Sequence, residues 1–236
     1  MKTSIFIKTW SGDIPWLKYC LQSIKLYGSG FEEVVIVADE SCVQDVYPIA
    51  DGARVIPVGD WTNGYIQQQW VKLNADQYTD ADQILFVDSD CVFHTPFTPE
   101  SYMRDGKPIL LKTDYQLLGS SIVWQAITSD FVGWYVDYEY MRRLPWMYKR
   151  SSLQNFRKTY LKLYNHLYGM EDRSFSEFNV LGAYIDRFEK DQYYISDTSV
   201  WMSESVAEQF WSWGGITPEI QTRINQYLKC EVSNAV

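Results

Sequence analysis

Residues 83–93, QILFVDSDCVF, form a short apolar run that ends abruptly in two carboxylates, Asp88 and Asp90. The continuous run from Ile84 to Val87 is typical of a central parallel strand buried on both faces, because a half-exposed strand would alternate apolar and polar residues. In open α/β sheets the ligand crevice lies outside the carboxyl ends of the strands. We therefore expect both carboxylates to face a ligand.

The spacing of the two aspartates indicates a metal. In extended backbone, residues i and i+2 point to the same side. Two unpaired carboxylates on one side repel each other and shift each other's pKa unless a cation joins them. A hard divalent cation, Mn²⁺ or Mg²⁺, takes oxygen ligands, and substrate phosphates often coordinate the same ion. The alternative is a pair of solvated aspartates that cap a loop.

The composition is that of a globular protein. The chain has 236 residues, with 46% hydrophobic and 22% charged residues, which predicts one domain over residues 1–236. Its net charge of −9 argues against broad nonspecific attraction to nucleic acid or an anionic membrane. Four cysteines without a C-x-x-C pair make thiolate metal sites and disulfides improbable. No signal-peptide region or membrane-length apolar segment is visible, so we expect a soluble, cytoplasmic protein.

The first half of the chain alternates strand and helix patterns. Strands are expected at 4–10, 33–39, 54–58 and 84–87, and helices from Pro15 to Gly28 and over 65–78. This order predicts an α/β fold with a mostly parallel central sheet and helices on both faces. The chain lacks the glycine-rich fingerprints of dinucleotide-binding and P-loop proteins.

The second half is richer in aromatic residues and is expected to be mainly helical. A strand is predicted at 108–113, a helix at 151–168, a buried helix that begins at Glu177 after a Ser176 cap, a strand at 193–195 and a helix at 218–228. The aromatic side chains suit a packed core, and they also suit walls for sugar rings or planar bases.

The order of elements and the run Phe86-Val87-Asp88-Ser89-Asp90 resemble the nucleotide-sugar-dependent glycosyltransferases of the GT-A (Rossmann-like) type. The likeness is strongest over residues 1–113, and residues 176–182, SEFNVLG, are similar to a segment of a poorly characterised GT-A-like family of bacteria and phages. The resemblance implies a nucleotide-sugar-binding half at 1–113 and an acceptor-binding half at 114–236. It also implies a location in the cytoplasm of a bacterial cell or an infected host.

The resemblance further implies a metal-dependent transfer from a nucleoside-diphosphate sugar, with a UDP-sugar favoured. Asp88 and Asp90 would hold Mn²⁺ or Mg²⁺ against the two phosphates, with Asp90 the more direct ligand. A divalent cation stabilises the charge that develops on the leaving diphosphate. By analogy, the residues expected near the nucleotide sugar are Thr9, Trp10, Asp39, Gln68, Lys72, Asp88 and Ser89.

Glu177 is the expected catalytic base, because an inverting transfer needs a carboxylate within hydrogen-bond reach of the acceptor hydroxyl. In a retaining enzyme Glu177 would only orient a substrate, and a helix N-terminus favours an acid there in any case. Many GT-A enzymes add a late histidine to the metal shell, but this chain has no histidine after His166. Asp197 or water is the expected third ligand.

Two other functions fit the same residues. A nucleotidyltransferase also uses paired carboxylates and a metal, but the loop after the first strand is short and not basic. A noncatalytic glycan-binding protein would use the aromatic residues without a metal. The acceptor of a transferase would be a glycan or, as in some phages, a hydroxymethylated DNA base. The only feature that favours DNA is a basic cluster, consisting of Lys149, Arg150, Arg157, Lys158 and Lys162.

Overall fold

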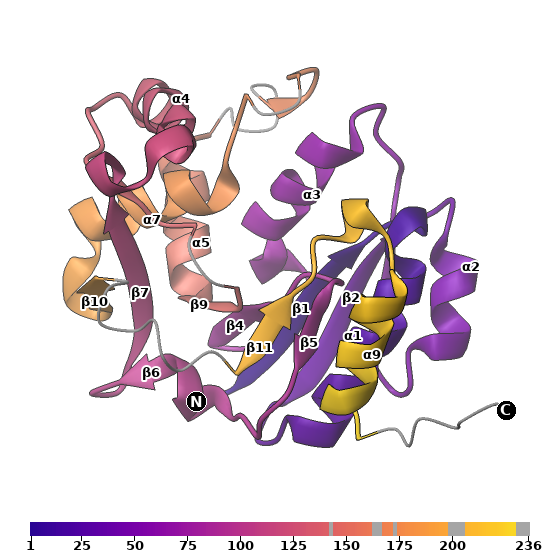
Figure 1. The fold of residues 1–236 in the computed structure, drawn as a ribbon. Helices are drawn as coiled ribbons and strands as arrows, with labels where there is room; N and C mark the ends of the chain where they lie inside the picture. The colour runs from indigo at the N-terminus through magenta and orange to yellow at the C-terminus, as the bar shows by residue number, and fades with distance from the viewer. Residues whose placement is uncertain (142–143, 162–166, 172–173, 198–205, 230–236) are drawn as a thin grey trace, which may run out of the picture.

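The central feature of the fold is a five-stranded sheet in the order β3-β2-β1-β4-β9 (Figure 1). The computed structural model describes residues 1–141, 144–161, 167–171, 174–197 and 206–229. Four strands are parallel and β9 is antiparallel to β4. The strands are β1 (Thr3–Thr9), β2 (Glu33–Asp39), β3 (Arg54–Val58), β4 (Gln83–Phe86) and β9 (Trp146–Lys149).

Three helices connect the parallel strands. They are α1 (Ile14–Tyr27), α2 (Val43–Val46) and α3 (Gly64–Leu73). The chain moves from β1 to β2 to β3 in one direction and then crosses back to β4, so right-handed crossovers place α3 on the face opposite α1 and α2 (Figure 1). This confirms the expected α/β architecture with a mostly parallel sheet. The strand order reverses between β1 and β4, which is where such sheets bind ligands.

The second half of the chain builds a smaller sheet beside the first. Strand β7 (Lys107–Asp114) pairs with β10 (Tyr194–Asp197) in parallel and with β6 (Met103–Arg104) and β8 (Tyr138–Glu139) in antiparallel orientation. The helices of this half are α4 (Val123–Val132), α5 (Arg150–Thr159) and α7 (Glu177–Phe188). Phe178 of α7 packs against Phe86 of β4 and Trp146 of β9, which joins the two halves through the core.

The C-terminal part of the chain returns to the aspartate pair. Strand β5 (Cys91–Phe93) directly follows Asp90 and pairs with β11 (Ala207–Gln209), more than a hundred residues later. Helix α9 (Pro218–Tyr227) follows, with the side chain of Thr217 accepting a hydrogen bond from the Ile220 amide at its start. Phe210 stacks on Trp16 of α1 with ring centroids 5.9 Å apart. These contacts fix β11 beside the carboxyl end of β4.

Several predicted boundaries differ from the structure. The helix expected over 151–168 ends at Thr159, and the one expected over 65–78 ends at Leu73 before a separate 3-10 turn. Ser176 precedes α7 as expected but makes no capping bond, because its hydroxyl accepts from Asn179 instead. The short strands β5, β9 and β11 were not predicted.

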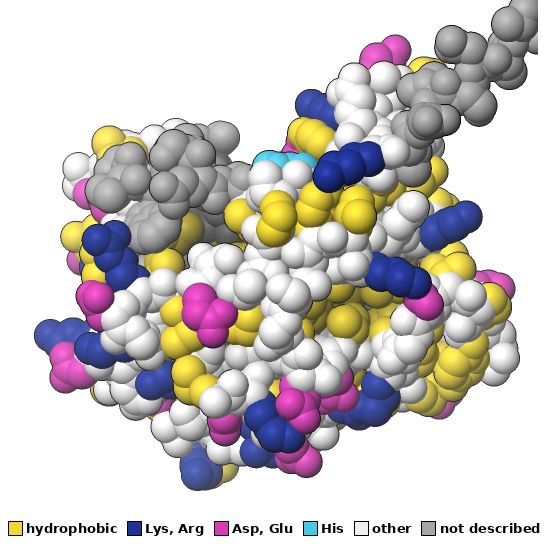
Figure 2. Space-filling model, turned by 90° about the horizontal axis from the view of Figure 1, so that it is seen from below, with side chains coloured by type: hydrophobic (Ala, Val, Ile, Leu, Met, Phe, Trp, Pro, Cys, Tyr) yellow, Lys and Arg dark blue, Asp and Glu magenta, His cyan; other side chains and the backbone are white. Residues whose placement is uncertain are grey.

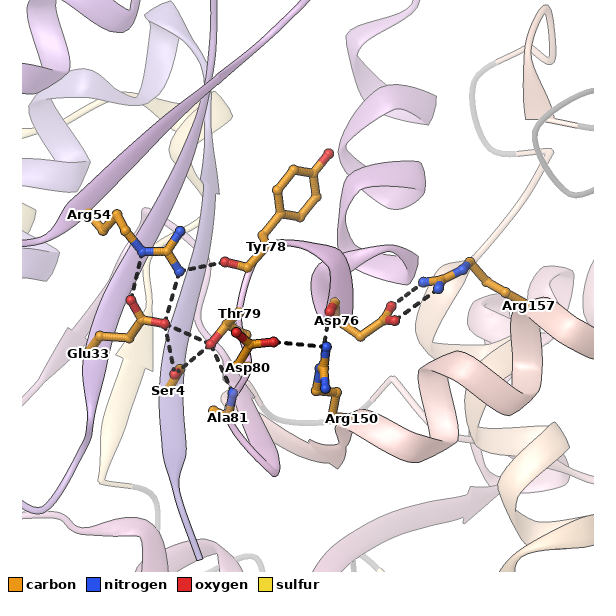
Figure 3. Close-up of polar contacts among 10 residues, drawn as sticks. All are labelled: Ser4, Glu33, Arg54, Asp76, Tyr78, Thr79, Asp80, Ala81, Arg150 and Arg157. Atoms are coloured by element: carbon orange, nitrogen blue, oxygen red, sulfur yellow. Dashed lines mark hydrogen bonds and ion pairs between the residues drawn. The ribbon is translucent and has the colours of Figure 1, made fainter.

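A network of ion pairs holds the amino ends of the strands (Figure 3). Arg54 of β3 binds both carboxylate oxygens of Glu33 on β2, at 2.8 and 2.9 Å, and also donates to the Tyr78 carbonyl. Glu33 in turn accepts from Thr79, in the loop before β4. The face of the molecule at this end carries interspersed acidic and basic side chains (Figure 2).

Two arginines of the basic cluster that would favour DNA form ion pairs beside this network. Arg157 forms a two-pronged ion pair with the buried Asp76, and Arg150 binds Asp80 at 3.1 Å (Figure 3). Lys149 lies within 3.4 Å of the Gln192 side-chain oxygen. Lys162 lies outside the described residues. The two arginines therefore anchor α5 to the first half of the chain.

Among the residues described, no helix combines the length and the apolar character needed to cross a membrane.

Candidate functional site

Asp88 and Asp90 converge at the carboxyl end of β4, but not through an extended backbone. The Cys91 amide donates to the Asp88 carbonyl at 3.0 Å, so the chain turns tightly between them. The side-chain nitrogen of Gln209, Nε2, lies 3.4 Å from Asp88 Oδ2 and 3.4 Å from Asp90 Oδ1. The predicted pairing of the two carboxylates is thus present, and β11 supplies a side chain that touches both.

Asp90 is buried and carries an unfavourable negative charge. Its Oδ2 accepts a 2.8 Å hydrogen bond from the Ser212 amide. Burial, and after it the charge of Asp88, raises the pKa of Asp90 to about 6. The carboxylate is therefore close to half protonated near pH 6, and a cation bound beside it would favour the ionised form.

Asp13 adds a third carboxylate to this group. It ends a 3-10 turn (Ser11–Asp13) that follows β1, and its backbone amide donates to the Trp10 carbonyl at 3.0 Å. Burial raises the pKa of Asp13, and the charge of Asp88 raises it further. Asp13, Asp88 and Asp90, which we call the carboxylate cluster, place their negative charges at one edge of the sheet.

Lys72 is the cation that faces this cluster. It lies in the last turn of α3, buried, with its Nζ 2.8 Å from Asp88 Oδ1 and 3.2 Å from Glu177 Oε1. Burial opposes the charge of Lys72, but the two carboxylates outweigh it and raise its pKa. One lysine therefore neutralises only one of the two carboxylates that it touches.

Glu177 occupies the first turn of α7, as predicted, but it is buried rather than open to an acceptor. Its amide donates to the Gln69 side chain at 3.0 Å, and its carboxylate pairs with Lys72. Burial raises the pKa of Glu177, and Lys72 offsets part of that effect. This geometry gives Glu177 a partner inside the protein, whereas the expected catalytic base would reach a substrate hydroxyl.

A pocket of about 780 Å³ lies at the carboxyl ends of β1 and β2. This volume is within the range of small-molecule and cofactor sites. Four of the residues predicted to contact a nucleotide sugar line it: Thr9, Trp10, Asp39 and Gln68. The other lining residues are Lys8, Thr62, Asn63, Gly64, Tyr65 and Glu171.

The floor of the pocket holds a buried ion pair and an unsatisfied hydroxyl. Lys8 Nζ lies 2.5 Å from Asp39 Oδ1 and also donates to the Thr9 carbonyl. The Thr9 hydroxyl is buried and has no hydrogen-bond partner among the described residues. Buried hydroxyls are normally bonded, so the Thr9 oxygen is an unsatisfied hydrogen-bonding group at the base of the pocket. Ser89 is different: its hydroxyl donates to the Lys8 carbonyl, which ties the turn after β4 to β1.

Helix α3 joins the pocket to the carboxylate cluster. Gln68 lines the pocket, and Lys72, one turn later on the same helix face, contacts Asp88. The helix begins beside the pocket, where the Asn63 side chain accepts from the Ile66 amide and Gly64 forms part of the wall. A helix N-terminus favours anions because of its unpaired amides and its dipole.

The donor set of the cluster fits a hard divalent cation. Asp88 and Asp90 offer carboxylate oxygens, and Mg²⁺ or Mn²⁺ commonly takes only one or two protein carboxylates, with water and phosphate supplying the rest. In the part of the chain that is described, no three His, Cys, Asp or Glu side chains are arranged to ligate one metal. Asp197 lies on β10 in the second sheet, opposite Lys112, and is not grouped with the aspartate pair.

Four residues of the site were missed from the sequence: Lys8, Asp13, Gln209 and Ser212. Asp13 was a candidate, because it lies in the short loop after β1, and such loops meet the sheet edge that carries Asp88. Lys8 was missed because it lies within an otherwise apolar strand that is buried on both faces. Gln209 and Ser212 carried no local signal, because they reach the site only through the pairing of β11 with β5.

A scan of the chain against models of known protein families finds no match, and a search of curated proteins finds none either. Function is therefore inferred from the geometry of the site.

Proposed function

We propose that the chain is a metal-dependent glycosyltransferase of the GT-A type that uses a nucleoside-diphosphate sugar, with UDP as the favoured nucleotide. One observation supports this above the others. Two carboxylates after β4 converge beside a nucleotide-sized pocket, at the point where the strand order of the sheet reverses.

The pocket would hold the nucleoside. Asp39 ends β2, and its second carboxylate oxygen can accept from ribose hydroxyls while Lys8 holds the first. The unpaired hydroxyl of Thr9 and the side chain of Gln68 offer further polar contacts. Tyr65 supplies aromatic surface for a planar base. The start of α3 favours the negative charge of a diphosphate.

Asp88 and Asp90 would hold Mn²⁺ or Mg²⁺, which supplies positive charge where the diphosphate leaves. The Gln209 amide lies across both carboxylates and must turn its oxygen inward, or move aside, when a cation binds there. The Ser212 amide fixes Asp90 in place, and Lys72 fixes Asp88. These contacts limit the motion of both carboxylates before substrate arrives.

Glu177 would act through Lys72 in this account. The Lys72–Glu177 pair positions the ammonium group against Asp88 and excludes water from it. The expected role of Glu177 as a base is replaced by a positioning role. The acceptor proton then needs another carboxylate, and we assign that role to Asp13, which is half-buried after β1 and whose pKa is raised by burial.

A thermal-shift panel tests the proposal. Nucleoside diphosphates and their sugars are each added with Mn²⁺, and again with a chelator. We expect one nucleotide, UDP first, to raise Tm only when Mn²⁺ is present. Stabilisation by a glycan alone, without effect of any nucleotide, would instead support a noncatalytic glycan-binding protein. Nucleoside triphosphates with sugar phosphates complete the panel, because pyrophosphate release would identify a nucleotidyltransferase.

A further inference from the structure

Three tryptophans beside the carboxylate cluster are exposed to an unusual degree. The exposed fractions are 53% for Trp10, 59% for Trp211 and 86% for Trp213. Indoles bury large surfaces in cores and interfaces, so three exposed ones in two loops at this edge of the sheet indicate a binding surface. Neither the nucleotide pocket nor the aspartate pair accounts for Trp211 or Trp213.

The three tryptophans lie in two loops beside the carboxylate cluster. The Asp13 amide donates to the Trp10 carbonyl at 3.0 Å, and Ser212 lies between Trp211 and Trp213. The Ser212 amide also donates to Asp90. The 3-10 turn that carries Trp213 (Ser212–Gly214) lies at the end of the molecule where β1 and β2 finish (Figure 1). The three tryptophans therefore belong to two loops that lie beside the proposed metal ligands.

Two of the tryptophans depend on an unusual local backbone. Trp211 has φ 58° and ψ 80°, in the left-handed region that a bulky residue rarely adopts. The Trp10 ring lies against Gly12, where an added Cβ would be only 2.4 Å from the indole. Gly12 thus leaves room for the indole, and the Ser212 bond to Asp90 supports the strained turn.

The charge of this surface decides which ligand fits it. An indole face stacks on the C–H face of a pyranose ring, and it also stacks on nucleobases. The adjoining carboxylate cluster repels a phosphodiester backbone, whereas carboxylates accept hydrogen bonds from sugar hydroxyls. The two arginines of the predicted basic cluster are held in ion pairs with Asp76 and Asp80. A neutral glycan fits the surface, and DNA does not.

We propose that Trp10, Trp211 and Trp213, in the two loops beside Asp13 and Asp90, form a subsite that binds a neutral pyranose ring of the acceptor glycan. Its role as an acceptor subsite rests on the proposed glycosyltransferase function, whereas the binding itself does not. The indoles hold the apolar face of the ring, and Asp13 accepts from a ring hydroxyl. This contact places that hydroxyl next to Asp88 and Asp90.

Fluorine NMR of the whole chain, labelled with 5-fluorotryptophan, tests this subsite. The chain has ten tryptophans, and single Trp→Phe variants assign their resonances. The probes are methyl β-D-glucopyranoside, methyl β-D-galactopyranoside and a single-stranded oligodeoxynucleotide, each added without nucleotide or metal. We expect the glycosides to shift the resonances of Trp10, Trp211 and Trp213 and to leave those of the other tryptophans in place.

Variants give a second readout. Trp213→Ala should weaken glycoside binding about five- to tenfold, as loss of one stacking contact predicts. Gly12→Ala should weaken it as well, because the new methyl group displaces the Trp10 indole. The control is Tyr47→Ala, which removes a half-exposed aromatic ring from the turn after α2.

Two results would overturn the subsite. One is that neither glycoside shifts the three resonances, and the other is that only the oligonucleotide does so. Because the titration contains no donor or metal, its failure leaves the nucleotide result intact. Conversely, a shift of the three resonances in a protein that binds no nucleotide would retain the subsite and reject the transferase.

Discussion

Lys72 Nζ lies 2.8 Å from Asp88 Oδ1 and 3.2 Å from Glu177 Oε1, so one buried ammonium group bridges two carboxylates. The bridge joins the last turn of α3, the end of β4 and the first turn of α7. It therefore couples the stability of the fold to the charge of the site. A buried ion pair that loses one partner is strongly destabilised, because the other charge stays buried.

Lys72→Met should lower the free energy of unfolding by about 3–5 kcal/mol, since it leaves Asp88 and Glu177 without their cation. Adding Glu177→Gln should recover part of this loss, and urea unfolding measures both. The matched control is Lys25→Met, because Lys25 forms an exposed pair with Asp51 at a similar 2.7 Å. Exposed pairs contribute little, so this variant should change stability by less than about 1 kcal/mol. Equal effects at both positions would refute the buried bridge.

Asp90→Asn should make the metal-free protein more stable at neutral pH. The folded pKa of Asp90 is about 6, above that of an unfolded aspartate, so ionised Asp90 opposes folding above pH 6. Removing the charge should contribute on the order of 2 kcal/mol at pH 8, by linkage. The gain in stability should vanish below about pH 4, where Asp90 is protonated in both the folded and the unfolded protein.

Thermal unfolding over a pH series measures this effect. Asp130→Asn serves as the control, because Asp130 is exposed on α4 and should give no such pH-dependent gain. An Asp90→Asn protein that is less stable than the parent at pH 8 would mean that its bonds to Ser212 and Gln209 outweigh the charge.

Thr9→Val should separate stability from binding. The Thr9 hydroxyl is buried without a partner among the described residues, so replacing it with a methyl group should raise stability by about 1 kcal/mol. It should also weaken UDP binding several-fold, because Thr9 lines the pocket. Thr128→Val is the matched control. Thr128 is equally buried and unpaired within the described part of the chain, but it lies on α4 away from the pocket.

Calorimetric titration with UDP and Mn²⁺, together with urea unfolding, compares the two valine variants. Equal UDP affinity in Thr9→Val and Thr128→Val would remove Thr9 from the nucleotide site.

Gly182→Ala should destabilise the packing of α7 on β8. An added Cβ would lie 2.3 Å from the Cβ of Tyr140. Tyr140 cannot easily move, because its amide donates to Asn179 and its hydroxyl donates to Asp186. We expect a loss of about 1–3 kcal/mol or more in urea unfolding. Gly59→Ala, at a position with open space around it, should be nearly neutral, and a neutral Gly182→Ala would contradict this packing.

The first half of the fold could be predicted because its signals are local. Apolar runs bounded by charges gave strands β2 and β3 with the observed bounds, and Gly28 marked the end of α1. Strands β9 and β11 have four and three residues, and only their distant partners β4 and β5 make them strands.

The site could be predicted only in part, for the same reason. The aspartate pair and Asp39 follow from their positions at strand ends, whereas Thr9, Trp10 and Gln68 were expected from the family resemblance. The partner of Glu177 could not be predicted, because Lys72 is separated from it by 105 positions in the sequence. The sequence shows that an acid, Glu177, begins α7. Its chemical role depends on its burial and on its ion pair with Lys72, which only the structure shows.

The central claim is that Asp88 and Asp90 hold a cation for a nucleotide bound in the adjacent pocket. Calorimetric titration of UDP into the parent protein and into Asp90→Asn, each with Mn²⁺ and with a chelator, tests it most directly. We predict binding to the parent protein that depends on Mn²⁺ and is lost in Asp90→Asn, although that variant stays folded. Equal UDP binding by both proteins, or binding unaffected by the chelator, would contradict the claim.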